Sequence, residues 1–292
     1  SKLLLNSITI SSASTSADSL GLDVDADSTV TSLSVGHITP VSIASGKSLS
    51  GAITVTVGSV KLDETGTLAS TIAMSGGTLD SDETSIVSGA LTQSGDIAID
   101  VATGKTLTYS GAAISLGAKT MTLSGGGTLG NTNALVLNNV NSKLLLNSIT
   151  VGSASTSADS LGLDVDNNST ITALSVGHIT PVSIAAGKSL SGAVTVTAGS
   201  LKLNETGTLA STIAMSGGTL DSDESSTVSG ALTQTADITI DVATGKILTY
   251  SGAAISVGAN TITLSGGGSF VSGGLTLNDA NSKLLLNSIT LD

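Results

Sequence analysis

The nine residues Ser-Lys-Leu-Leu-Leu-Asn-Ser-Ile-Thr occur three times in this chain, beginning at Ser1, Ser142 and Ser282. Residues 1–141 and 142–281 are near-copies, roughly 80% identical, and residues 282–292 begin a third copy. Such a repeat restricts the fold strongly, because each copy must adopt the same local structure. We therefore interpret the chain as a segment of a longer tandem array, with one repeat copy at 1–141, a second at 142–281 and the start of a third at 282–292.

A shorter period lies inside the long one. The spacings of one tripeptide, Ser-Gly-Ala, are close to multiples of about 20 residues. It begins at Ser50, Ser88, Ser110, Ser191, Ser229 and Ser251. Seven units of about 20 residues would fill one long repeat, and equivalent residues of successive units are predicted to lie over one another.

Within these units the apolar residues alternate with polar ones. Ile97, Ile99 and Val101 are separated by single residues, and so are Leu20, Leu22 and Val24. A period of two is typical of strands buried on one face, and glycines end the runs after about four to six residues. Short strands and a 20-residue period predict an all-β parallel β-solenoid with about 20 residues and three strands per coil. Tandem β-sandwich domains of about 140 residues are the alternative.

The composition agrees with a narrow interior. Aromatic residues are 1% of the chain, with no Trp, whereas 39% of residues are hydrophobic. A thin core of Leu, Ile, Val and Ala is expected, in which Phe or Trp would fit poorly. Asn residues gather near the end of the first copy, where they predict a stacked ladder at a corner of the solenoid. They are Asn131, Asn133, Asn138, Asn139, Asn141 and Asn147.

Charge narrows the range of partners. The net charge is −12 and all ten basic residues are Lys. Nucleic acids and anionic lipids require clustered basic groups, so neither is an expected partner. No run approaches the roughly 18 apolar residues of a spanning helix, which argues against membrane insertion.

Three segments carry a family resemblance. They are Gly46-Lys47-Ser48-Leu49, Gly104-Lys105-Thr106-Leu107-Thr108 and the Thr-Leu-Ser-Gly-Gly-Gly run that starts at Thr122. These segments resemble repeats of large bacterial surface proteins, namely filamentous-haemagglutinin-like adhesins and autotransporter passengers. The resemblance implies a right-handed parallel β-helix, secretion, an extracellular or cell-surface location, and a role as stalk, adhesin or fibre.

An Asp-x-Asp-x-Asp run suggests a calcium loop. It contains Asp23, Asp25 and Asp27, and the second copy has Asp164 and Asp166. A full EF-hand loop also needs Gly at position 6 and Glu at position 12, where this chain has Ser. We expect these residues to lie on the outer side of a strand, with calcium as an open alternative and no other cofactor.

Other motifs point away from catalysis. The Gly-Lys-Ser and Gly-Lys-Thr segments lack the first Gly of a phosphate-binding loop and predict tight turns. His37 and His178, the only histidines, are interpreted as turn residues. Carboxylates recur identically in both copies, with no insertion long enough to build a cleft, so we do not expect an enzyme. Thr-x-Thr pairs such as Thr54–Thr56 leave ice binding as a remote alternative, since they do not recur on every coil.

Self-association is the expected partnership. Leu4, Leu145 and Leu285 are predicted to point outward from their strands, as a line for lateral bundling. Neither end reads as a polar cap, so copies are expected to continue head to tail, either as one longer chain or by docking. The predicted function is a non-catalytic structural module of an extracellular fibre, filament or adhesin stalk. A calcium- or glycan-binding surface module is the alternative.

Overall fold

The computed structural model describes every residue from Ser1 to Asp292 and consists of β-strands joined by turns, without a helix. The chain divides into two compact units. Unit 1 comprises Ser1–Val136 and Asn147–Ser153, and unit 2 comprises Leu137–Leu146 and Ala154–Asp292. These units lie close to the two sequence copies but interleave around residue 142. Each unit is a β-solenoid, so the predicted fold class is confirmed and the β-sandwich alternative is wrong.

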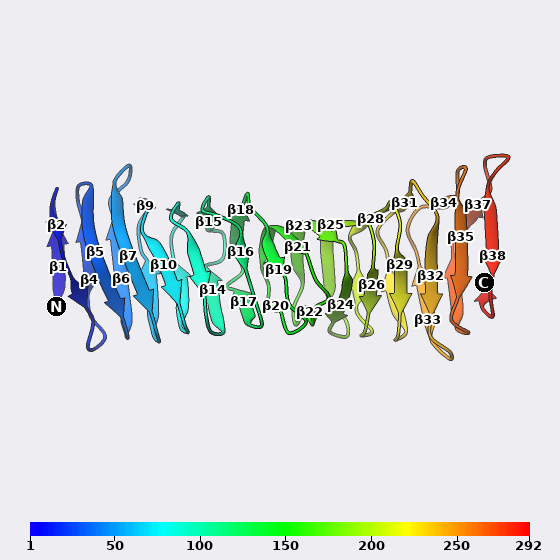
Figure 1. Cartoon of the computed structure of the whole chain (residues 1–292), viewed down its shortest axis with the longest axis horizontal. Helices are drawn as coiled ribbons and strands as arrows, with labels where there is room; N and C mark the ends of the chain where they lie inside the picture. The colour runs from blue at the N-terminus through cyan, green and yellow to red at the C-terminus, as the bar shows by residue number, and fades with distance from the viewer. The chain divides into compact units, whose positions relative to one another are not determined.

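One strand of every coil contributes to a parallel sheet that we call sheet A. In unit 1 its strands are, in order, β1 (Lys2–Leu5), β4 (Gly21–Val24), β6 (Ile38–Ile43), β8 (Ser59–Leu62), β11 (Thr78–Ser81), β14 (Ile97–Val101) and β17 (Thr120–Ser124). In unit 2 they are β20 (Lys143–Leu146), β22 (Gly162–Val165), β24 (Ile179–Ile184), β26 (Ser200–Leu203), β29 (Thr219–Ser222), β32 (Ile238–Val242), β35 (Thr261–Ser265) and β38 (Lys283–Leu286). Strands of successive coils lie side by side within each unit (Figure 1).

The other strands of each coil form the remaining wall, which we call sheet B; β34 and β37 pair apart from it. Those of the first copy are β2 (Thr9–Ile10), β3 (Ala13–Ser14), β5 (Ser28–Val35), β7 (Ser48–Val55), β9 (Thr67–Leu68), β10 (Thr71–Met74), β12 (Ser85–Val87), β13 (Leu91–Gln93), β15 (Thr106–Tyr109), β16 (Ile114–Ser115), β18 (Thr128–Asn131) and β19 (Leu135–Leu137). Those that follow are β21 (Thr150–Thr156), β23 (Ser169–Val176), β25 (Ser189–Val196), β27 (Thr208–Leu209), β28 (Thr212–Met215), β30 (Ser226–Val228), β31 (Leu232–Gln234), β33 (Ile247–Tyr250), β34 (Ile255–Ser256), β36 (Ser269–Ser272), β37 (Leu275–Thr276) and β39 (Thr290–Leu291).

The register of sheet A confirms the 20-residue period. Val60 pairs with Leu79, nineteen residues on, and Ile99 pairs with Leu123, twenty-four residues on. These residues form an inward column, and the residues beside them form an outward one. The predicted alternation in Ile97–Val101 is also confirmed, since Ile97, Ile99 and Val101 are buried. Because strands in a sheet lie about 4.8 Å apart, each coil buries its aliphatic side chains against the next.

Glycine is required where the backbone turns a corner against the previous coil. A Cβ at Gly89 would overlap the carbonyl oxygen of Ser70, and one at Gly111 would overlap that of Gly89. Gly89 and Gly111 are the central residues of two Ser-Gly-Ala tripeptides, so the predicted stacking of these tripeptides is confirmed for this pair. The second copy repeats the contacts at Gly230 and Gly252.

Three expectations about particular side chains are wrong. Leu20 is not an inward residue but lies exposed, just before β4 begins. Phe270 and both tyrosines are fully buried, so the interior accepts single rings; Tyr109 does so by donating its hydroxyl to the Ala112 carbonyl. Asn131 pairs in register with Tyr109, so no asparagine ladder forms. Instead the Asn131 amide bonds to the backbone of Ser153 on the next coil.

Candidate functional site

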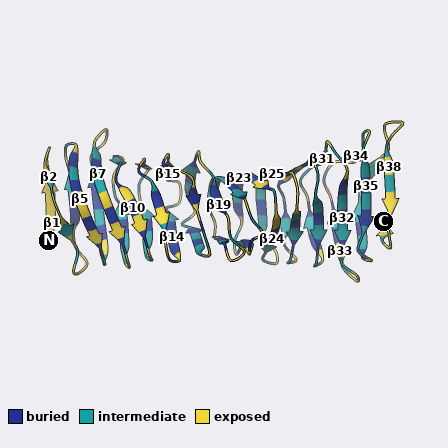
Figure 2. Cartoon of the chain, in the orientation of Figure 1, coloured by how far each residue is buried: buried dark blue, intermediate teal, exposed yellow.

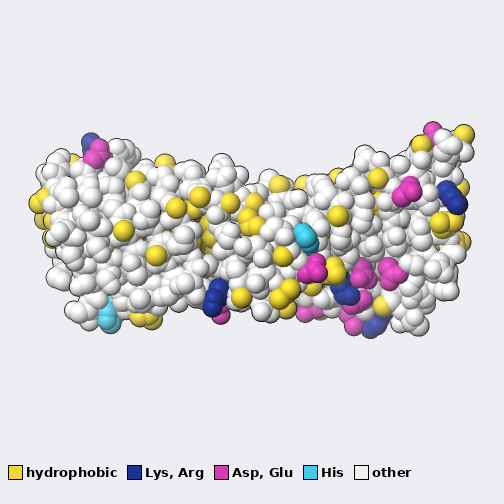
Figure 3. Space-filling view, viewed as in Figure 1, with side chains coloured by type: hydrophobic (Ala, Val, Ile, Leu, Met, Phe, Trp, Pro, Cys, Tyr) yellow, Lys and Arg dark blue, Asp and Glu magenta, His cyan; other side chains and the backbone are white.

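Lysine–carboxylate pairs join successive coils on the outer side of sheet A and its adjoining turns. Lys61 Nζ lies 2.6 Å from Asp82 Oδ2 and 4.0 Å from Asp80 Oδ2. Lys105 Nζ lies 2.6 Å from Glu83 Oε2. The second copy repeats these pairs with Lys202–Asp221, Lys202–Asp223 and Lys246–Glu224. On the face seen in Figure 3, most basic side chains have an acidic one beside them.

These pairs explain the acidic turn that follows β11. The lysine partners of Asp82 and Glu83 were not predicted from the sequence. They become apparent only when residues about 20 apart are aligned, which places each acid beside a Lys of a neighbouring coil. Half-exposed ion pairs of this kind contribute at most about 1 kcal/mol each, so they favour one register more than they add stability.

Two carboxylates lie beside each other on sheet A. Asp80 pairs in register with Asp100, and Asp100 pairs with Ser124, whose hydroxyl donates to the Asp100 carboxylate. Burial raises the pKa of the Asp80 carboxyl above its ordinary 3.8, and the charge of Asp82 raises this pKa further. Together with Ser59, Thr78 and Ala98 they line a cavity of about 330 Å³. Asp221 and Asp241 repeat the arrangement in the second copy.

The calcium candidates are not brought together. Asp23 lies on the outer side of β4 and pairs with Lys2 at 2.7 Å. Asp25 and Asp27 lie in the following turn, where Asp27 Oδ1 accepts hydrogen bonds from the Ser48 backbone amide and hydroxyl. Asp164 pairs with Lys143 at 2.7 Å and Asp166 is exposed in the turn after β22. Nowhere do three His, Cys, Asp or Glu side chains form a group that could hold a metal ion.

The remaining polar motifs lie in turns, or on strand faces where the same residue type does not recur on the adjacent coils. His37 and His178 lie in turns before β6 and β24, and each ring nitrogen Nδ1 is 3.8 Å from an Asp carboxylate, Asp18 or Asp159. Gly46 and Gly104 have positive φ in tight turns that lead into β7 and β15. Thr54 has Ser34 and Ala73 as its register partners, so its Thr-x-Thr face does not continue on the adjacent coils.

The three outward leucines do lie on the outer side of their strands. Leu4 is 66% exposed and Leu285 is 39% exposed, whereas Leu145 is half-buried. Leu4 and Leu145 occupy equivalent positions, each in register with an aspartate of the next coil, Asp23 or Asp164. A line for lateral bundling along these leucines remains a prediction.

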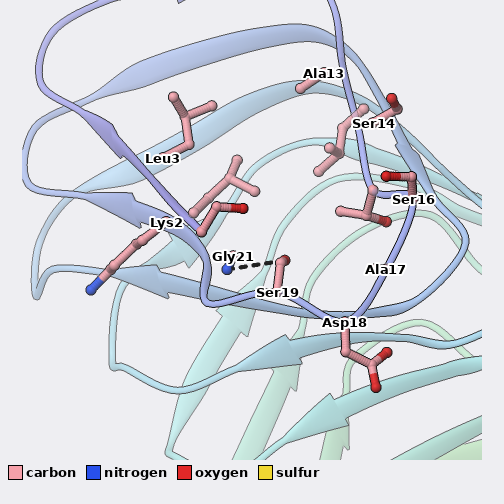
Figure 4. A pocket seen from close by; sticks show the side chains of 13 residues that line it. Lys2, Leu3, Ala13, Ser14, Ser16, Ala17, Asp18, Ser19 and Gly21 are labelled. Atoms are coloured by element: carbon pink, nitrogen blue, oxygen red, sulfur yellow. Dashed lines mark hydrogen bonds between the residues drawn. The ribbon is translucent and has the colours of Figure 1, made fainter.

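A cavity of about 370 Å³ opens beside β1 and the loop that leads into β4. Leu3 lies on one side of it, and Ala13 and Ser14 lie across from Leu3 (Figure 4). Ser19 closes the loop by accepting a hydrogen bond from the Gly21 amide at 3.1 Å. This cavity was not predicted from the sequence.

Comparison with protein-family models, curated proteins and solved structures gives no match. The chain has no helix of the length and apolar character needed to cross a membrane. The features of this chain that bear on function are its stacked coils and the ion pairs that recur between them.

Proposed function

We propose that this chain is a non-catalytic structural module of an extracellular fibre, filament or adhesin stalk. The observation that carries this proposal is repetition. The buried column through Ile99 recurs through Ile240, and the Lys61 ion pairs recur at Lys202, so the same surface is presented by both copies. Function in such a module comes from extension and repetition.

Backbone hydrogen bonds hold the coils of such a module together. In a parallel solenoid, backbone hydrogen bonds run from each coil to the next, so every coil is held by two neighbours. The aliphatic interior and the corner glycines allow coils to be added without altering the pattern. Outward Ser, Thr, Asp and Lys side chains keep the surface polar.

The geometry does not favour the alternative roles. The calcium candidates Asp23 and Asp164 are engaged by lysines, and Ca²⁺ takes about six to eight oxygen ligands. The Thr-x-Thr face at Thr54 is interrupted on neighbouring coils. No cluster of exposed aromatic rings is present for stacking on sugars, because the three aromatic residues are buried.

Location and assembly test the proposal together. Antibodies against this segment should label intact cells that produce it, and protease treatment of intact cells should remove the label. Electron microscopy of the released material should show filaments carrying the same antibody. Labelling that requires permeabilised cells would contradict the extracellular role.

A further inference from the structure

Three asparagines of the second copy are each followed two positions later by Ser or Thr. They are Asn167, Asn168 and Asn204. The tripeptide Asn-x-Ser/Thr, in which x is not Pro, is the acceptor sequence for N-linked glycans in exported proteins, and the sugar is joined to the side-chain amide nitrogen. No other Asn of the chain begins this tripeptide. The surroundings of each amide group decide which of the three can carry a sugar in the folded chain.

Asn168 presents its amide nitrogen to solvent. It lies exposed in the turn between β22 and β23, ahead of a strand whose residues alternate between buried and more exposed (Figure 2). Its Oδ1 accepts hydrogen bonds from the backbone amide of Ser189 at 2.9 Å and from the Ser189 hydroxyl at 3.3 Å. Only the amide oxygen can accept from a backbone N–H, so these bonds fix the orientation of the group. Nδ2 donates no hydrogen bond within the chain.

The corner beside Asn168 has room for a sugar. The turn of the next coil runs opposite, because Val165 is in register with Ile184 and Ser169 with Leu190. In that turn Gly187 is exposed, and a Cβ added there would meet no atom within 4 Å. An N-glycosidic bond uses Nδ2 and leaves Oδ1 free to accept, so a sugar on Asn168 leaves both bonds to Ser189 in place.

The other two acceptor sequences are less open. Asn167 is half-buried, and the Ser169 hydroxyl that completes its tripeptide is buried and donates to the Asn167 carbonyl at 2.9 Å. Asn204 is half-buried, and its Oδ1 is buried without a hydrogen-bond partner. A sugar on either amide group would have to be accommodated against the neighbouring backbone. Asn168 is therefore the acceptor that the folded coil tolerates.

The first copy shows that the turn itself does not require Asn. Asp27 occupies the position of Asn168, and its Oδ1 accepts the same two hydrogen bonds from Ser48, at 2.8 Å from the amide and 3.1 Å from the hydroxyl. The two residues that follow, Ser and Thr, are the same in both copies. A carboxylate lacks the nitrogen that a sugar would be joined to, so two turns of equal structure differ in whether they can be modified.

We propose that Asn168 is an attachment site for an N-linked glycan. The donor is a sugar whose C1 carries a diphosphate leaving group, and a transferase joins it to the chain. Nδ2 forms the bond to C1, the bond from C1 to the diphosphate oxygen breaks with its electrons on the diphosphate, and one Nδ2 proton passes to a base of the transferase. In the folded coil the Thr170 hydroxyl of the tripeptide is 2.7 Å from the Ser191 hydroxyl, so transfer precedes folding of this coil. The inference goes beyond the structural role proposed above and rests on it only in that the chain meets the transferase during export.

Mass spectrometry of the full chain from the cells that produce it tests this site. Cleavage after Lys places Asn168 in the peptide 144–188 and Asn204 in the peptide 203–246. The equivalent turn of the first copy lies in the peptide 3–47. We expect the mass of a glycan on the peptide 144–188, with fragmentation placing it on Asn168, and no glycan on the asparagine of the peptide 203–246.

Three variants provide matched controls. Thr170→Val keeps the amide but removes the acceptor hydroxyl, and Asn168→Asp copies the turn of the first copy; each should lose the glycan. Asp27→Asn creates the same Asn-Ser-Thr sequence in the first copy, so the peptide 3–47 should gain one. The melting temperature of the glycosylated chain should equal that of Asn168→Asp, because the sugar extends into solvent.

A bare Asn168 in the chain from producing cells would overturn the proposal. A glycan on Asn204 with Asn168 bare, or one on Asn168 that persists in Thr170→Val, would overturn it as well. None of these results alters the antibody labelling of intact cells, so a labelled chain without a glycan refutes the attachment site and leaves the extracellular role standing. Labelling that requires permeabilised cells refutes the extracellular role instead.

Discussion

The two repeat copies are almost the same sequence and make almost the same internal contacts, yet their first strands differ. Ile99 and Ile240 occupy identical columns, and Lys61 and Lys202 hold equivalent aspartates. By contrast, Leu3 is 41% exposed and its counterpart Leu144 is fully buried. Burial in this fold is therefore decided by the neighbouring coils, because each coil contacts only the coils beside it.

A buried charge should give the largest effect and should act equally in both copies. Ile99→Asp and Ile240→Asp are each expected to destabilise by about 3–5 kcal/mol, since the aliphatic interior offers no partner for a carboxylate. Denaturant unfolding followed by circular dichroism measures this. The controls Asp100→Asn and Asp241→Asn, on the outer side, should stay within about 1 kcal/mol. Equal costs for Ile99→Asp and Asp100→Asn would contradict the inward assignment.

The same leucine should matter differently in its two environments. Leu144→Ala is expected to cost about 2–5 kcal/mol, because it removes a fully buried side chain, whereas Leu3→Ala should cost less than about 1 kcal/mol. Unfolding at micromolar concentration gives both values. If Leu3→Ala lowered the free energy of unfolding as much as Leu144→Ala, the local sequence and not the stacking of coils would determine the contribution of this leucine to stability.

Corner glycines provide a steric test. Gly89→Ala and Gly230→Ala should each destabilise by about 1–3 kcal/mol, because the added methyl group overlaps the backbone of the preceding coil. Gly130→Ala is the matched control, since a Cβ there meets only ordinary contacts and should be tolerated within about 0.5 kcal/mol. Thermal melting compares the three. Tolerance of Ala at both corners would mean that the coils are not held this closely.

The smallest effect concerns Asp63, whose counterpart is Asn204. Burial raises the pKa of Asp63 above 3.8, so the folded state favours the protonated form. Its stabilising influence is thus present below pH 3.8 and is lost as pH rises through the raised pKa. Asp63→Asn should stabilise by a few tenths of a kcal/mol at pH 7, and Asn204→Asp should destabilise by a similar amount, since solvent screens the site. Melting at pH 3 and pH 7 checks both; a pH response unchanged by either substitution would refute the assignment.

Much of the fold could be predicted from the sequence. Alternation in Ile97–Val101 and the 20-residue period were sufficient for strands and stacking, because both depend on local spacing. The same alternation wrongly predicted that Leu20 points inward. Leu20 continues the alternating pattern in the sequence but lies just before the strand, where the backbone does not hold its side chain inward. The burial of Phe270 could not be predicted from composition. Composition indicates what side chains fill the interior on average, but not whether one coil has room for an aromatic ring.

Less of the candidate site could be predicted. The outward orientation of Leu4 follows from alternation, but its exposure depends on whether another coil covers the strand. The ion pairs of Lys61 and Lys105 depend on register across coils, which varies from 19 to 24 residues and is set by the turns. The cavity beside β1 depends on how the loop that leads into β4 folds in three dimensions, which a sequence pattern does not record.

Amide hydrogen exchange of the three nonapeptides measures how strongly the neighbouring coils protect each strand. Flanking residues differ, so mass spectrometry distinguishes the peptides that contain residues 2–9, 143–150 and 283–290. At dilute concentration we expect slow exchange at Leu144–Leu146 and exchange at least about a hundred-fold faster at Leu3–Leu5 and Leu284–Leu286. Equal protection of all three copies at dilute concentration would contradict the claim that neighbouring coils, and not the sequence of a coil, determine its burial and stability.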